Sequence, residues 1–159
     1  GRVYFEAVIS KCHTVNSVFA GKNYTSLPRT DIIYTHCDDD GVLIEAAVNA
    51  GAQGIIYAGS GMGSIHCGAE AALLKAVQRG VAVVRSTRVS EGRVLAADPK
   101  WDEAGFICGG NLNPQKARIL LQLALTCTKD TKKYKKFLTN INGRRQYYGI
   151  AGTNFGRKR

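Results

Sequence analysis

Three short apolar runs, each followed by a helical pattern, constrain the fold of this chain more than any other feature. The runs are "DIIYTH" at 31–36, "QGIIYAG" at 53–59 and "VAVVRSTR" at 81–88, and helical patterns at 38–51 and 67–79 separate them. Continuous apolar sequence is typical of strands buried on both faces. Strands and helices that alternate through short connections predict an α/β fold: a small parallel four-stranded sheet with helices on both faces.

Signals for helix ends support this interpretation. An aspartate of the 38–40 cluster is a ready N-cap for the first helix, and Gly51 and Gly80 are suitable stops for the first and second. Asn113 as N-cap and Pro114 at the first helical position mark the clearest helix, expected at 113–128.

The remaining segments complete a single domain, which suits a chain of 159 residues. We expect a strand at 2–9, a long loop at 89–104, a short fourth strand at 105–110 and a basic helix at 130–141. The predicted division is a linker and first-strand region at 1–30, the α/β domain at 31–141, and a basic tail at 142–159 that we expect to be disordered.

The net charge of +10 belongs to the end of the chain rather than to the fold. Ten of the 22 basic residues, but only one of the 12 acidic residues, lie from Lys129 onward. A solvated basic helix and tail is the simplest explanation, with weak binding to polyanions as the functional one. No apolar run is long enough to span a bilayer, so no membrane contact is expected.

The five cysteines form an odd set without CxxC spacing, which argues against a disulfide framework and favours a reducing, cytoplasmic compartment. Three of them adjoin histidines, as Cys12–His13, His36–Cys37 and His66–Cys67, and two pairs could meet if their loops are neighbours. The usual zinc-ligand spacings are missing, so we predict no metal site and no cofactor.

The stretch "YAGSGMGS" resembles a dinucleotide-binding turn, with glycines at 59, 61 and 63. The fingerprint fails at its third glycine, where Ser64 stands, and Thr87 and Arg88 replace the acid expected after the next strand. The glycines imply that either a ligand or other backbone approaches closely. Two alternatives remain open: a tight turn without a ligand, in which Ser64 caps the second helix, or a nucleotide site.

Five ordered blocks resemble the C-terminal domain of the bacterial-type L-asparaginases. They are "CHTVNSVFAG", "SLPRTDIIYTH", "AGAQGIIYAGSGMGS", "VVRSTRVSEG" and "NLNPQKARILLQLALTCTKD", and the likeness runs from about Val3 to Ile141. The family's catalytic threonine motifs, which belong to its larger N-terminal domain, do not occur in these 159 residues. The resemblance therefore implies that no catalytic residue lies in this chain, which alone should be inactive.

The resemblance also implies a substrate-binding role. In the family, the C-terminal domain of one subunit reaches into a neighbour's site and holds the α-ammonium group of asparagine or aspartate within a homo-oligomer, a tetramer in the parent family. Carried over, the two contacts fall on Ser64 and on Asp98, with Asp102 or Glu103 as replacements if the loop shifts. The simpler role for Asp98 is to fix the turn at Pro99. The competing hypothesis is a non-catalytic α/β module that binds a nucleotide or another small molecule.

Overall fold

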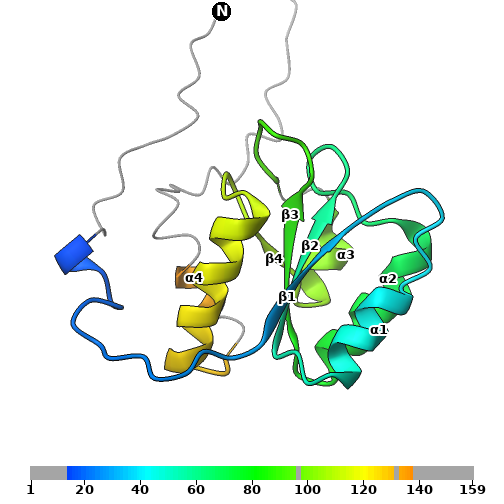
Figure 1. The fold of residues 1–159 in the computed structure, drawn as a ribbon. Helices are drawn as coiled ribbons and strands as arrows, with labels where there is room; N and C mark the ends of the chain where they lie inside the picture. Colours follow the sequence, from blue (N-terminus) through cyan, green and yellow to red (C-terminus); the bar gives the residue numbers. More distant parts are fainter. Residues whose placement is uncertain (1–13, 96–97, 131–132, 138–159) are drawn as a thin grey trace, which may run out of the picture.

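The fold is built on one four-stranded parallel sheet (Figure 1). The computed structural model describes residues 14–95, 98–130 and 133–137. Neighbouring strands follow the order β1-β2-β3-β4, and every pair is parallel, which confirms the predicted sheet. The strands are β1 (Thr30–Tyr34), β2 (Gly54–Gly59), β3 (Ala82–Thr87) and β4 (Ile107–Cys108).

Helices cover both faces of the sheet, as predicted. Figure 1 shows α1 and α2 on one face and α4 on the other. The strands follow one another across the sheet in sequence order, and right-handed crossovers between such strands place their connecting helices on the same face. The helix after β4 does not connect two strands of this sheet and can therefore cover the opposite face. The helices are η1 (Thr14–Asn16), α1 (Val42–Asn49), α2 (Cys67–Gln78), α3 (Pro99–Glu103) and α4 (Pro114–Cys127).

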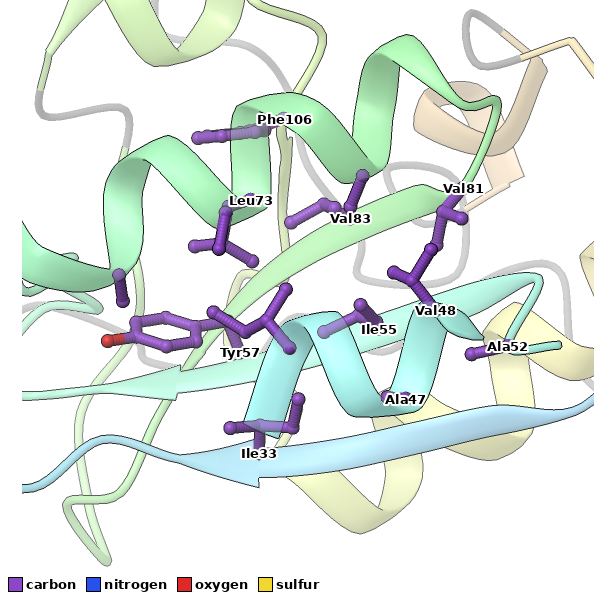
Figure 2. Close-up of a cluster of buried hydrophobic side chains, with 14 residues drawn as sticks. Ile33, Ala47, Val48, Ala52, Ile55, Tyr57, Leu73, Val81, Val83 and Phe106 are labelled. Atoms are coloured by element: carbon purple, nitrogen blue, oxygen red, sulfur yellow. The ribbon is translucent and has the colours of Figure 1, made fainter. Parts of the chain in front are cut away.

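The sheet separates two apolar cores. The first core lies under α1 and α2, where Ile55, Tyr57, Leu73 and Val83 are fully buried (Figure 2). The second core lies under α4, where Leu121 packs with residues of β2 and β3. All six residues of β2 are buried, as are all six of β3, which matches the continuous apolar runs in the sequence.

Most of the predicted helix ends are confirmed. Gly51 and Gly80 follow α1 and α2 with φ of 86° and 83°, a left-handed conformation that glycine adopts without strain. Asn113 caps α4, since its Oδ1 accepts from Lys116 N at 2.9 Å. The N-cap residue of α1 is Gly41 rather than an aspartate, although Asp40 Oδ1 accepts a hydrogen bond from Val42 N at 3.0 Å.

Two predictions about the second half need correction. The loop expected throughout 89–104 contains the short helix α3, and the fourth strand is two residues long instead of spanning 105–110. Residues 133–137 are helical, within the predicted helix at 130–141. The strand predicted at 2–9 and the tail at 142–159 lie outside the described residues. Over the described part of the chain, no helix has the length and apolar character needed to cross a membrane.

Candidate functional site

The glycine turn lies at the carboxyl end of β2, the edge of a parallel sheet where ligands usually bind. The turn folds back on itself, because Ser60 O accepts from both Gly63 N and Ser64 N at 2.9 Å. A Cβ on Gly59 would lie 2.1 Å from Ser64 O, and one on Gly63 would lie 2.9 Å from Ser86 O. Backbone packed against backbone therefore explains these two glycines without any phosphate, and Ser64 is left exposed at the surface.

The simpler role predicted for Ser64, as N-cap of α2, is wrong. The N-cap residue is His66, whose Nδ1 lies 3.2 Å from Gly68 N and 2.9 Å from Asp39 O. That nitrogen accepts from Gly68 in one tautomer and donates to the Asp39 carbonyl in the other. The first state caps the start of α2, and the second holds that start against the loop after β1. The Ser64 side chain is not used in capping the helix.

A buried tyrosine anchors the far end of the turn. Tyr57, on β2, donates to Asp39 Oδ2 at 2.8 Å and accepts from His66 N at 3.3 Å. Figure 2 shows its ring among the apolar side chains of the first core. Burial is the main reason that the pKa of Tyr57 is raised, so the hydroxyl keeps its proton and remains a hydrogen-bond donor at neutral pH.

The near side of the turn rests on a buried arginine. Arg85, on β3, is 2% exposed, and its Nε donates to Gly63 O at 3.1 Å. Its Nη2 donates to Leu95 O at 3.3 Å, in the loop that leads to α3. Its guanidinium carbon lies 4.4 Å from the ring centroid of Trp101 in α3. One side chain thus contacts both segments that carry the predicted site residues.

Asp98 starts α3, and its Oδ1 accepts from Lys100 N at 3.0 Å. The simpler role predicted for Asp98 was to fix a turn at Pro99, and the structure shows that it caps a short helix instead. Its Oδ2 lies 3.6 Å from Lys100 Nζ, which also pairs with Glu70 of α2 at 3.0 Å. These contacts place Asp98 beside the first turn of α2, which directly follows the glycine turn.

The two replacement acids are placed differently. Asp102 pairs with Lys135 at 3.2 Å, and therefore faces the helical residues 133–137. Glu103 is the last residue of α3 and is exposed. Within the described part of the chain, Asp98 is the one acid of the three that shares a cation, Lys100, with α2.

Three contributors to this site escaped the sequence analysis: Arg85, Glu70 and Trp101. Glu70 Oε1 accepts from Trp101 Nε1 at 2.7 Å, and the bonds from Lys100 and then Trp101 lower the pKa of Glu70. The sequence carries one signal for such a role, which is a charged residue in the middle of "VAVVRSTR". A buried arginine needs partners for its donors, and those partners are distant in sequence.

A polar hollow of about 420 Å³ lies at the carboxyl ends of β1 and β2. His36, Cys37, His66 and Cys67 line it together with Arg88, so two of the three His–Cys pairs lie on one hollow. Across residues 14–95, 98–130 and 133–137, no group of three or more His, Cys, Asp and Glu side chains could hold a metal ion.

Fold and site together define an α/β domain that presents a glycine turn and an acid-bearing helix at the carboxyl edge of its sheet. Residues 29–138 match the family model described as the glutaminase/asparaginase C-terminal domain. The chain belongs to this family, as its resemblance to the asparaginases implies.

Several relatives show how much of such a protein the chain represents. It is 44% identical to an L-asparaginase 2 of Bacillus subtilis over 85% of this chain and 36% of that protein. It is 41% identical to a probable periplasmic L-asparaginase of Haemophilus influenzae, over 88% of this chain and 40% of that protein. A crystal structure of a probable cytoplasmic L-asparaginase from Campylobacter jejuni matches with a TM-score of 0.77 and 43% identity, over 86% of this chain and 45% of that one. The chain thus spans less than half the length of these three relatives.

Proposed function

We propose that this chain is the substrate-binding C-terminal domain of an L-asparaginase-type amidohydrolase, which converts asparagine to aspartate and ammonia. The chain would complete the active site of a neighbouring subunit in a homo-oligomer. The nucleophile would be a threonine of an N-terminal domain: its hydroxyl forms an acyl ester as ammonia leaves, and water then hydrolyses the ester. The role of this chain is to hold the substrate in place.

One observation carries the proposal: Ser64 is exposed on the glycine turn, and the buried Arg85 bonds both Gly63 of that turn and Leu95 of the segment that leads to Asp98. A free amino acid offers an ammonium group, and a carboxylate together with a hydroxyl oxygen is a suitable acceptor pair. Neither side chain is buried, and Ser64 is not used as a helix cap. Asp98 would exchange its weak 3.6 Å pairing with Lys100 for the substrate ammonium.

Asp98 is our choice among the three acids because of its surroundings. It lies at the end of α3 that pairs with the start of α2, whereas Asp102 is engaged with Lys135. Glu103 lies at the opposite end of the same helix from Asp98.

The competing hypothesis of a nucleotide-binding module has less support. In doubly wound sheets, nucleotides occupy the crevice between strands whose following loops leave toward opposite faces. In this sheet the corresponding crevice lies between β3 and β4. The fully buried Val94 occupies it, and its N donates to Gly110 O at 2.8 Å. Thermal melting with NADP and with aspartate separates the two hypotheses, because a shift with NADP alone would favour the module.

The direct test restores the missing chemistry. The chain is joined to the part of the Bacillus subtilis relative that it does not match, to give a hybrid enzyme, and ammonia release from asparagine is measured. We expect release by the hybrid and none above background by the chain alone, since holding a substrate without a nucleophile lowers the barrier very little. Release by the chain alone that disappears in Ser64→Ala would overturn the proposal, because Ser64 would then be a nucleophile.

We also propose a cytoplasmic compartment, on the evidence of the cysteines. Among the described residues, Cys37, Cys67 and Cys127 are exposed and form no disulfide. Exposed thiols persist in reducing surroundings, so we place the protein in the cytoplasm.

A further inference from the structure

Arg85 occupies a position where an arginine is costly. It lies in the middle of β3, directly after the fully buried Val83 and Val84, and is itself 2% exposed. Burial lowers the pKa of its guanidinium, yet an arginine side chain stays charged in proteins. A buried charge is retained only where its donors are satisfied, so the contacts of Arg85 indicate why it is there.

Those contacts join two segments that are far apart in sequence. The guanidinium plane carries its donors in a rigid fork, and Arg85 directs Nε to Gly63 O and Nη2 to Leu95 O. Gly63 directly precedes Ser64, and Leu95 lies three residues before Asp98. A lysine could not reproduce this, because its single ammonium has no fixed fork.

The face of the same guanidinium makes the third contact. It stacks on Trp101 at 4.4 Å, a cation–π geometry, and Trp101 Nε1 in turn donates to Glu70 Oε1. Glu70 belongs to the first turn of α2, which follows the glycine turn. The contacts therefore form a closed circuit: glycine turn, Arg85, Trp101, Glu70, α2 and back to the turn.

We infer that Arg85 is a positioning residue that holds the Ser64 turn and the Asp98 segment in one fixed arrangement for the substrate ammonium. This inference rests on the proposed function. Arg85 does not touch the substrate itself, because it lies under the turn. Its contribution is that two acceptors on separate loops keep the spacing that one ammonium group requires.

Hydrogen exchange on the chain itself tests the structural half. Arg85→Lys and Arg85→Met are compared with Arg79→Met, a matched control whose guanidinium bonds Asn49 Oδ1 at the other end of α2. In both Arg85 variants we expect exchange of the amides of Gly63, Ser64 and Phe106, whose N donates to Trp101 O, to rise by about tenfold or more. Exchange of the Ala50 amide, at the C-cap of α1, should stay unchanged. Because Trp101 is the only tryptophan, its emission should also shift. Unchanged exchange at all three amides would overturn the inference.

Arg85→Met could unfold the sheet, so a milder variant accompanies it. Glu70→Gln removes the carboxylate charge from a partly exposed site and leaves Arg85 in place. We expect it to raise exchange at Phe106 while Gly63 and Ser64 stay near the wild-type rate. If Glu70→Gln instead loosened the turn and left Phe106 unchanged, the circuit through Trp101 would be wrong.

Kinetics of the hybrid enzyme test the functional half. We expect Arg85→Lys to raise KM for asparagine about tenfold with kcat changed less than about twofold, while Arg79→Met leaves both unchanged. If Ser64→Ala raises KM and Arg85→Lys does not, the positioning role is overturned and the proposed function stands. If neither substitution changes KM, the proposed function is overturned, and the positioning role with it.

Discussion

The two segments that carry the proposed substrate contacts are held in place by different means. In the glycine turn, backbone packs on backbone, at Gly59 against Ser64 O and at Gly63 against Ser86 O. In the segment after β3, exposed polar side chains make many of the contacts, such as Lys100 with Glu70. Exposed ion pairs contribute about 0–1 kcal/mol each, whereas backbone atoms in contact cannot move apart without refolding the turn. We therefore expect substitutions in the glycine turn to cost more stability than substitutions in the segment after β3, which Arg85 holds in place at Leu95 and Trp101.

The same substitution in both segments should show the largest contrast. Gly59→Ala places a Cβ 2.1 Å from a backbone oxygen, so we expect a loss of about 3 kcal/mol or more in the free energy of unfolding. In Gly92→Ala the new Cβ meets nothing within 4 Å, so the φ of 106° is the source of strain. We expect this variant to lose about 1–2 kcal/mol in the free energy of unfolding. Denaturant unfolding of the two variants measures both values, and equal losses would remove the contrast.

A smaller effect separates the two roles of Asp98. Asp98→Ala removes the cap of α3 and should cost about 0.5–2 kcal/mol of stability. Asp98→Asn keeps an acceptor for Lys100 N and should cost less stability, about 0.3 kcal/mol. Both should weaken asparagine turnover by the hybrid enzyme, since both remove the charge. If turnover follows stability instead, and Asn restores it, Asp98 is a cap and nothing more.

The replacement acids provide the control for that experiment. Asp102→Ala and Glu103→Ala should leave turnover unchanged, because neither residue lies at the end of α3 that pairs with the start of α2. Turnover that falls in one of these variants but not in Asp98→Ala would move the substrate contact along α3.

The smallest expected effect is a pH dependence of the segment after β3. Hydrogen bonds from Lys100 and Trp101 hold the pKa of Glu70 below its ordinary value of 4.5. The folded state therefore binds this proton less readily than the unfolded state, and the stabilisation is complete above pH 4.5 and lost as the pH falls through the lower folded value. Unfolding between pH 3 and 6 should show a small slope that is absent in Glu70→Gln, and an identical slope in that variant would assign it to other carboxylates.

Most of the sheet was predictable because its signals are local. Each buried strand is a continuous apolar run, and Gly51, Gly80 and Asn113 mark helix ends where the structure has them. The helix α3 was missed although Asp98–Pro99 carries the same start signal as Asn113–Pro114. It is only five residues long before Gly105 and has no periodic apolar pattern.

The site was predictable only in part, for a physical reason. The resemblance to the asparaginases singled out Ser64, which directly follows the glycines of the turn. The link between Ser64 and Asp98 runs through Arg85, whose partners Gly63 and Trp101 lie 22 and 16 positions away on opposite sides of it. Contacts of this kind depend on how loops meet in space, and no spacing along the chain reports them.

The central claim is that Ser64 binds the α-ammonium group of the substrate, and a substrate without that group tests it most directly. The hybrid enzyme and its Ser64→Ala variant are assayed for ammonia release from asparagine and from succinamate, the same amide without the amino group. We expect kcat/KM for asparagine to fall about 5- to 150-fold in the variant, equivalent to about 1–3 kcal/mol, with kcat/KM for succinamate unchanged. Equal losses with the two substrates, or no loss with asparagine, would contradict the account.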